Sequence, residues 1–186
     1  MKSFNLNNKT FYYKGNIDLL ESNQKRIGVV GTRKPSTESI AFTEQKVSEL
    51  SKDNIIVSGL ALGTDKIAHQ TCLDNGGLTI AVLPCGLDKI YPLMHTKLAN
   101  EIIQNDGLLI SEYEPKVKPN RKRFIERDKI IATLSDELLV PQCNFKSGTM
   151  HTVNFAKELN KKIYVQNKDY SGNISILKTY EKSYPL

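Results

Sequence analysis

In Val29-Val30-Gly31-Thr32-Arg33-Lys34-Pro35-Ser36, an apolar strand end runs through a glycine turn into a helix start. A helix N-terminus offers unpaired amides and the positive end of the helix dipole, so the hydroxyl and the two cations in this turn suit a bound phosphate. The stretch does not have the G-x-G-x-x-G spacing of a dinucleotide site, which disfavours a dehydrogenase-type site. Its residues alone are equally typical of an ordinary turn between a strand and a helix.

Six short apolar runs rich in β-branched residues recur along the chain, each followed by glycine, proline, serine or polar residues. They occupy residues 27–30, 55–57, 79–83, 108–110, 138–140 and 163–165. The runs are continuous rather than alternating in polarity. They are therefore typical of strands in a parallel sheet that helices cover on both faces.

Segments of helical length separate the six predicted strands. Ser36 is expected to cap a helix that ends near Leu50, and Asp65 is expected to cap the next one, which Gly76-Gly77 would end. Two further apolar stripes at helical spacing consist of Met94, Leu98 and Ile102 and of Val153, Ala156 and Leu159. This alternation predicts a single α/β domain of Rossmann-like design with a doubly wound, mostly parallel sheet. Ligands of such sheets bind outside the carboxyl ends of the strands.

The composition is that of a basic globular chain of one-domain size. Its 186 residues include 26 lysines and arginines against 20 acids, a formal charge of +6, which favours encounter with polyanions. The densest basic stretch spans residues 116–129. Because charge runs are usually solvated faces, this stretch does not identify a partner by itself.

The cysteines, the histidines and the first residues give no sign of a metal, a cofactor or export. The three cysteines lie far apart and the three histidines lack metal-ligand spacing, so we expect neither a metal nor a cofactor. Residues 1–9 are polar and lack the apolar stretch of a secretory signal, so we expect a cytoplasmic protein. The alternating pattern stops near residue 167, which predicts a domain over residues 1–167 and a loosely attached tail over residues 168–186.

A second glycine-containing loop follows the second predicted strand, in Ser58-Gly59-Leu60-Ala61-Leu62-Gly63-Thr64-Asp65. Gly59 and Gly63 would let backbone amides approach an anion closely, whereas Asp65 would cap the following helix. His69 is expected to brace this loop rather than to act as an acid or a base. The two loops thus predict a phosphate site at the strand ends.

Several short motifs follow one another in a fixed order. The first are Val30-Gly31-Thr32-Arg33, Val57-Ser58-Gly59-Leu60-Ala61-x-Gly63-x-Asp65-x-x-Ala68-His69 and Gly76-Gly77-x-Thr79-Ile80-Ala81-Val82-Leu83. The later ones are Gly86-Leu87-Asp88 with Tyr91-Pro92, Ser111-Glu112, Phe124-x-x-Arg127, Ile130-Ile131-Ala132-x-Leu134-Ser135 and Lys146-Ser147-Gly148-x-x-x-Thr152. In this order they resemble the DNA-processing protein A (DprA, or Smf) family over roughly residues 10–167. The resemblance is to the Rossmann-like domain of that family only.

The resemblance implies a domain that binds single-stranded DNA without catalysis. It implies a homodimer that protects incoming DNA during DNA uptake in competence and transformation, and that delivers the DNA to a RecA-type recombinase for recombination. By position, Arg33, Ser58, Gly59, Lys122, Arg123 and Arg127 would line a phosphate pocket, closed by Ser147 and Gly148. Guanidinium groups can grip phosphate and stack on bases without reading sequence. With the residues of the two loops, the predicted phosphate-binding set is Gly31, Thr32, Arg33, Ser58, Gly59, Gly63, Lys122, Arg123, Arg127, Ser147 and Gly148.

Five positions depart from the usual pattern of the family. They are Ile125 in place of proline, Asp128 in place of asparagine, Lys129 in place of arginine, Gln142 in place of an acidic residue and His95 in place of asparagine. Asp128 would add a negative charge beside the predicted phosphate grip. The departures cluster around the predicted site rather than in the predicted core.

Two other functions remain open from the residues. The main alternative is a small-nucleotide-binding sensor or scavenger of the same superfamily, and the lesser one is a nucleotide-cleaving enzyme. The phosphoribohydrolase branch uses a P-G-G-x-G-T-x-x-E loop with a catalytic glutamate, whereas the corresponding residues 145–152 contain no carboxylate. Asp65 and Glu112 could be read as a catalytic pair, but a helix cap and a loop anchor explain them with fewer assumptions. We therefore expect no enzyme activity.

Overall fold

The computed structural model describes residues 2–6 and 9–186. The strands are β1 (Lys2–Leu6), β2 (Lys9–Gly15), β3 (Arg26–Val29), β4 (Ile55–Ser58), β5 (Thr79–Val82), β6 (Leu108–Ser111), β7 (Glu137–Val140), β8 (Lys162–Val165) and β9 (Ser183–Pro185). The helices are α1 (Thr37–Leu50), α2 (Thr64–Asp74), α3 (Thr96–Gln104), α4 (Arg121–Leu134), α5 (Thr149–Glu158) and α6 (Ser171–Thr179), with short 3₁₀ helices at Ile17–Leu20 and Leu93–His95. None of the helices in the described residues is both long and apolar enough to cross a membrane.

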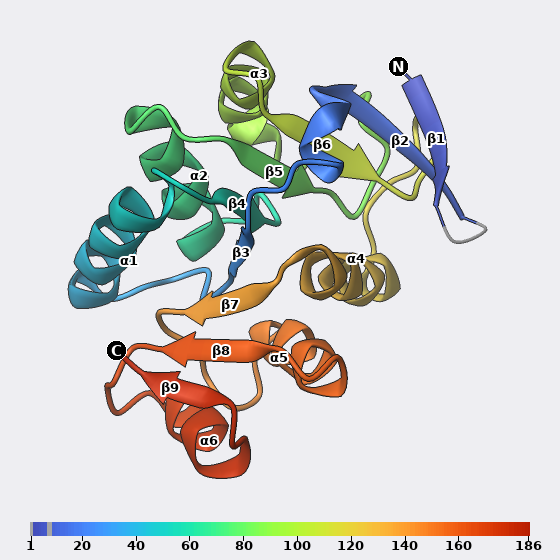
Figure 1. Ribbon diagram of the computed structural model, residues 1–186. Helices are drawn as coiled ribbons and strands as arrows, with labels where there is room; N and C mark the ends of the chain where they lie inside the picture. The colour runs from blue at the N-terminus through green and yellow to red at the C-terminus, as the bar shows by residue number, and fades with distance from the viewer. Residues whose placement is uncertain (1, 7–8) are drawn as a thin grey trace.

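The described strands form one sheet in the order β1-β2-β6-β5-β4-β3-β7-β8-β9 (Figure 1). From β6 to β9 all neighbours are parallel, whereas β2 pairs antiparallel with β6 and with β1. The six strands predicted from apolar runs are β3 to β8, and the predicted α/β class with a doubly wound, mostly parallel sheet is confirmed. The hairpin β1–β2 adds the antiparallel part.

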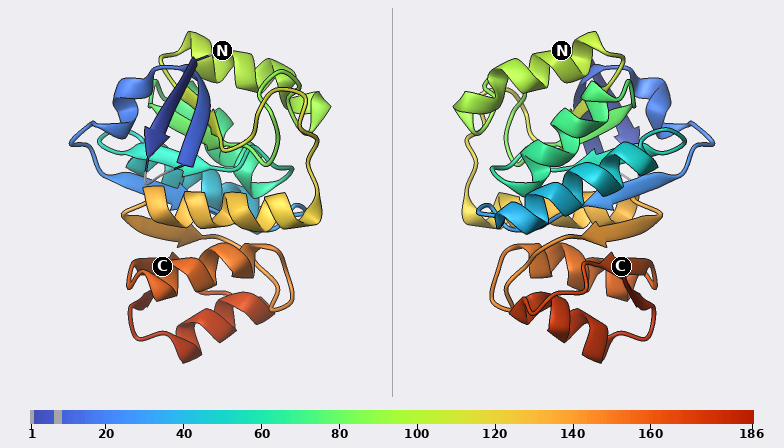
Figure 2. Two further views of the ribbon diagram at one scale, coloured as in Figure 1. Left: turned by 90° about the vertical axis from the view of Figure 1, so that its right-hand side faces the viewer. Right: turned by 90° about the vertical axis from the view of Figure 1, so that its left-hand side faces the viewer.

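Helices cover both faces of the central strands, as the continuous apolar runs predicted. Helices α1, α2 and α3 lie on one side of the sheet, and α4 and α5 pack together on the other (Figures 1 and 2). In β4, Ile55 and Val57 pack in the same buried cluster as Ile131 of α4, whereas Ile56 packs with Val47 and Ala68 of the opposite layer. Each strand residue is therefore buried whichever way its side chain points.

The start of α1 is confirmed, because Ser36 caps this helix by accepting a hydrogen bond from the amide of Ser39. The predicted cap of α2 is wrong. Gly63 occupies the cap position, and Asp65 lies in the first turn of the helix. The preceding loop folds back over this turn, so that its amides reach the carboxylate of Asp65 and the helix end receives no side-chain cap.

Each of the other two predicted apolar stripes includes one residue that lies outside the helix and is not buried. Leu98 and Ile102 are buried, but Met94 precedes α3 and is 73% exposed. Val153 and Ala156 are buried, but Leu159 follows the last residue of α5 and is half-exposed. In each case the helix has its boundary inside the apolar spacing, and the outermost residue leaves the buried face.

The loose attachment expected for residues 168–186 is wrong, because this segment forms α6 and β9. Strand β9 pairs in parallel with β8, and Ile176 of α6 is fully buried in the core. The fully buried side chain of Asn173 accepts from the amide of Cys143 at 2.9 Å and donates to the carbonyls of Pro141 and Gln166 at 2.9 and 3.0 Å. The apolar side chains that attach the segment, Ile176 in the core with Leu177 and Tyr180 packed against it, are scattered rather than continuous, so the sequence shows no apolar run there.

Candidate phosphate-binding site

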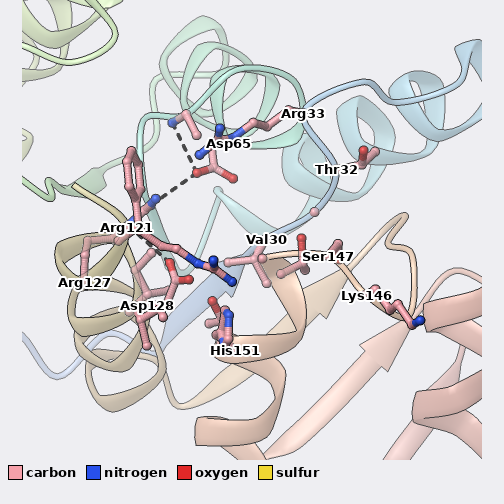
Figure 3. A pocket seen from close by; sticks show the side chains of 18 of the residues that line it. Val30, Thr32, Arg33, Asp65, Arg121, Arg127, Asp128, Lys146, Ser147 and His151 are labelled. Atoms are coloured by element: carbon pink, nitrogen blue, oxygen red, sulfur yellow. Dashed lines mark hydrogen bonds and ion pairs between the residues drawn. The ribbon is translucent and has the colours of Figure 1, made fainter. Parts of the chain in front are cut away.

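A cavity of about 670 Å³ opens at the carboxyl ends of β3 and β7. Its walls are the loop after β3, the start of α2, one face of α4 and the residues around the start of α5 (Figure 3). The chain leaves β3 toward β4 on one side and reaches β7 on the other, so this is the switch point of the doubly wound sheet. Ligands of such sheets bind at this place.

Three cations line the cavity without an ion pair among the described residues. Arg33, Arg121 and Lys146 line the cavity, are exposed, and form no ion pair with any described residue. They come from three different elements, the β3–α1 loop, the first turn of α4 and the β7–α5 loop (Figure 3). This arrangement attracts an anion that can contact all three walls.

Hydrogen-bond donors lie on the same side of the cavity as Lys146. The hydroxyl oxygen of Ser147 is buried and has no hydrogen-bond partner among the described residues. Helix α5 begins beside it at Thr149, and Gly148 in the cap position has no side chain that could accept from the first amides. A phosphate oxygen is the kind of acceptor that this hydroxyl and this helix end lack.

A second charged group of the cavity is neutralised internally. The guanidinium of Arg127 has its Nη1 atom 3.5 Å from Oδ2 of Asp65 and its Nε atom 3.3 Å from Oδ1 of Asp128. Burial raises the pKa of the Asp128 carboxyl to about 6, although the charges of Arg127 and Arg33 oppose this shift. Arg127 is 5% exposed, so its positive charge mainly neutralises the two carboxylates and is less available to a ligand.

Hydrogen bonds to the side chains of Asp65 and His95 fix the loop after β4. Oδ2 of Asp65 accepts from the amides of Gly59 and Ala61, each at 3.2 Å. A Cβ atom on Gly59 would overlap Nη1 of Arg127, so any side chain at this position would displace the guanidinium from its carboxylate partners. Nδ1 of His95 lies 2.8 Å from the carbonyl oxygen of Leu60, whose φ of 58° is left-handed. Histidine at position 95 thus supports a strained turn.

The loop after β3 is fixed by Gln142. The amide of Thr32 donates to the backbone carbonyl of Gln142, and the amide of Ser36 donates to its side-chain Oε1, both at 2.8 Å. From α2, the amide of Thr64 donates to the carbonyl of Thr32 at 3.1 Å. Gly63, with a φ of 73°, allows this approach, because a Cβ there would lie 2.4 Å from the same carbonyl oxygen. Arg33 therefore projects from a loop held at both ends.

Residues 1–179 match the model of the DNA recombination-mediator protein A family. The chain belongs to this family. It is 39% identical over 153 residues to DNA processing protein DprA of Streptococcus pneumoniae, covering 82% of this chain and 53% of that protein. It is 42% identical over 156 residues to protein Smf of Synechocystis, covering 82% of this chain and 39% of that protein. The chain spans about half the length of the curated relatives it matches or less.

Solved structures of the same family share the fold. DNA processing protein A of Helicobacter pylori, whose structure concerns a single-stranded DNA binding mode, superimposes with a TM-score of 0.90 at 31% identity, covering 99% of this chain and 89% of that chain. The S. pneumoniae protein gives a TM-score of 0.88 at 33% identity, and the match covers 95% of this chain and 62% of that chain. A molybdenum cofactor binding protein of Rippkaea orientalis is similar in fold alone. It is 17% identical, with a TM-score of 0.64, and the match covers 88% of this chain and 89% of that chain.

The structure brings most of the residues predicted from the family motifs to one place. Those that line the cavity are Gly31, Thr32, Arg33, Arg127, Ser147 and Gly148. Gly59 lines a smaller adjoining cleft, and Gly63 supports the loop that carries Arg33. Ser58 is fully buried and donates to the carbonyl of Val29 at 2.7 Å, so its hydroxyl does not face the cavity.

The other two predicted cations lie away from the cavity. Lys122 pairs with Glu126 at 3.7 Å, while Arg123 donates to the carbonyl of Lys118 and lies 5.3 Å from the ring of Tyr113. Neither is among the residues that line the cavity. Their role in binding DNA stays a prediction.

Sequence reasoning missed Arg121, Lys146 and His151, which all line the cavity. Asn120 caps α4 by accepting from the amide of Arg123, a signal that the sequence contains. With the helix starting at Arg121, residues spaced by three or four, Arg121, Phe124, Ile125 and Asp128, share the face that lines the cavity. Helical spacing within the basic stretch would thus have favoured Arg121 over its two neighbours.

The remaining polar candidates serve the fold. Glu112 pairs with Lys9 at 2.7 Å, whereas Asp65 contacts Arg127, so the two carboxylates do not meet in the cavity. His69 is fully buried with Nδ1 2.7 Å from Oγ1 of Thr79, and burial lowers the pKa of His69 to about 3. The imidazole is therefore neutral, which agrees with its expected bracing role.

Proposed function

We propose that this chain binds single-stranded DNA by holding a backbone phosphate in the cavity. The observation that carries the proposal is that one cavity is lined by Arg33, Arg121 and Lys146, none with an ion-pair partner among the described residues, and by Ser147, whose hydroxyl has no hydrogen-bond partner among those residues. Contacts of this kind attract any phosphodiester and do not read bases. The single-stranded DNA binding mode of the H. pylori relative supports the same ligand.

Fluorescence anisotropy with a single strand of about 20 nucleotides, the matching duplex and a mononucleotide tests the proposal at two salt concentrations. We expect the single strand to bind best and its affinity to fall steeply with salt. Arg33→Ala should weaken binding, whereas Lys52→Ala removes an exposed cation at the other end of the strands and should not. Preferential binding of the mononucleotide, with no salt-dependent binding of the single strand, would favour a small-nucleotide pocket instead.

We further propose that the site is not catalytic. Residues 145–152 supply no carboxylate, and the two carboxylates that line the cavity, Asp65 and Asp128, both face the guanidinium of Arg127. Incubation with nucleoside monophosphates, followed by chromatography of the products, should show no release of free base. Release above a buffer control that disappears in Asp128→Asn would overturn this proposal and assign Asp128 an acid–base role.

The assembly and partners proposed for the chain follow from its family. We propose that it acts in the cytoplasm as a homodimer that hands DNA to a RecA-type recombinase, in line with the family's description as recombination mediators. In the described part of the chain, β9 forms an edge of the sheet, where Tyr184 and Leu186 are 38% and 47% exposed. Sedimentation velocity should show a dimer. Recombinase assembly on single strands should speed up when the chain is added.

A further inference from the structure

An exposed aromatic ring belongs to the same loop as Lys146 and Ser147. Phe145 is 58% exposed, the largest exposed fraction of any aromatic side chain in residues 2–6 and 9–186. It directly precedes Lys146 in the β7–α5 loop, but it is not among the residues that line the cavity. The ring therefore stands outside the cavity, next to a cation that lines it.

Hydrogen bonds to α6 fix the backbone that carries this ring. The amide of Phe145 donates to Oγ of Ser171 at 3.1 Å. Two residues earlier, the amide of Cys143 donates to the buried side chain of Asn173 at 2.9 Å, and its carbonyl accepts from the amide of Gly172 at 3.1 Å. A ligand that contacts the ring therefore has to order little of the loop, which lowers the entropic cost of binding.

The same loop is joined to the loop that carries Arg33. Gln142, three residues before Phe145, accepts from the amide of Thr32 with its backbone carbonyl and from the amide of Ser36 with its side chain. The ring and the guanidinium of Arg33 are therefore carried by two loops that Gln142 holds together. A single ligand can contact both loops without any rearrangement of the backbone between them.

The surroundings of Phe145 define the kind of ligand that can cover the ring. Single exposed apolar side chains are common on protein surfaces and need no partner. This ring differs because its backbone is fixed and because the next residue, Lys146, is a cation without an ion pair in the described part of the chain. An anion with a flat apolar group close to its charge satisfies both. A nucleotide within a strand is such a ligand, because its base is attached beside the backbone phosphate.

We propose that Phe145 stacks on the base that adjoins the phosphate held by Lys146 and Ser147. The inference rests on the proposed function and deepens it, because it adds a contact that is not electrostatic. Stacking on the ring gives affinity that requires a base but does not depend on which base it is. Bases of a duplex are already paired and stacked on their neighbours, so this contact also favours single strands.

Tryptophan at position 145 would report on the stack directly. The chain contains no tryptophan, so Phe145→Trp introduces a single indole at the proposed contact. A base stacked on an indole quenches its fluorescence. A thymidine oligonucleotide should therefore quench the emission of Phe145→Trp. An abasic oligonucleotide of the same length keeps every phosphate and should bind without quenching, with binding itself followed by anisotropy of the labelled strands.

Leu159→Trp is the matched control. Leu159 is 45% exposed, and the ten residues of α5 separate it from the residues at the cavity. This variant should bind the thymidine strand as the wild type does, with unchanged emission. Quenching of Phe145→Trp by the abasic strand, or no quenching by a thymidine strand that binds, overturns the proposed stack.

Phe145→Ala measures how much affinity the stack contributes. It should weaken binding of the thymidine strand about five- to tenfold, the lower part of the range for one stacked base. Binding of the abasic strand and the salt dependence should not change, because no phosphate contact is lost. An equal loss with the abasic strand would assign the ring to the positioning of Lys146 and overturn the stack alone. Failure of the wild type to bind either oligonucleotide would overturn the proposed function as well.

Discussion

Nη1 of Arg127 lies 3.5 Å from Oδ2 of Asp65, and both side chains are less than a tenth exposed. The motif reading assigned Arg127 to the phosphate grip. The structure places it between two carboxylates, where its first effect is to neutralise them. Arg33, Arg121 and Lys146 are the cations of the proposed site that form no ion pair with any described residue.

Arg127→Ala should destabilise the protein. The substitution leaves Asp65 and Asp128 buried without their counter-ion, a change that typically costs about 3–5 kcal/mol. Urea unfolding measures the loss, and the double variant Arg127→Ala/Asp128→Asn should recover part of it by removing one of the two charges. An unchanged free energy of unfolding in Arg127→Ala would mean that the guanidinium is free to serve a ligand, as the motif suggested.

Asp128→Asn should stabilise the protein at neutral and alkaline pH. Burial raises the pKa of the Asp128 carboxyl from its ordinary 3.8 to about 6, so the folded state holds this proton more tightly than the unfolded state. Wild-type stability therefore falls as pH rises from about 4 to about 6, at a scale of about 1.4 kcal/mol per unit of pKa difference. The gain from asparagine should be full at about pH 8 and vanish near pH 4. Thermal melting across this range provides the measurement, and a pH-independent difference contradicts the assignment.

The same substitution should strengthen binding to single-stranded DNA above the pKa of Asp128. Ionised Asp128 places a negative charge in the wall of the phosphate cavity, and asparagine removes it. In the wild type, affinity should rise as pH falls below about 6, whereas the variant should lack this part of the pH dependence. Anisotropy titrations at several pH values compare the two proteins at constant ionic strength. Parallel pH profiles would show that Asp128 does not face the bound phosphate.

Arg121 and Lys122 are adjacent, but only Arg121 should matter for binding. Arg121 lines the cavity and forms no ion pair within the described part of the chain, whereas Lys122 is paired with Glu126 and does not line the cavity. Loss of one phosphate contact should flatten the slope of log affinity against log salt by about 0.7 for a single strand. We expect this change in Arg121→Ala and not in Lys122→Ala. The reverse result would restore the assignment that the family motif favoured.

Two glycines of the predicted site should respond differently to alanine. In Gly59→Ala the new methyl group would overlap Nη1 of Arg127, so the buried ion pairs must move and the melting temperature should fall. At Gly148 no atom lies within 4 Å of the Cβ position, and its φ of −58° suits alanine. The melting temperature of Gly148→Ala should therefore match that of the wild type, which makes it a control for the effect at Gly59.

The core strands could be predicted from the sequence because each was a continuous apolar run, as in Ile55 to Val57. A strand that is buried on both faces has apolar residues at every position, and this is visible in the sequence. The site was predicted less completely, since a cation that faces the cavity differs from a neighbouring cation only in the direction of its side chain. Arg121 and Lys122 have the same charge in the sequence, and the starting residue of α4 decides which one faces the cavity. Residues 168–186 were misjudged because a buried amide and backbone pairing, rather than an apolar run, attach them.

The amide side chain of Asn173 holds the backbone at Pro141 and Cys143, and the hydroxyl of Ser171 accepts from the amide of Phe145. The loop that carries Lys146 and Ser147 is thus tied down by residues synthesised after it. The phosphate loop gains its anchor only when α6 has left the ribosome. A nascent chain that stops short of Asn173 therefore exposes basic side chains without the fixed geometry that would let them hold a strand.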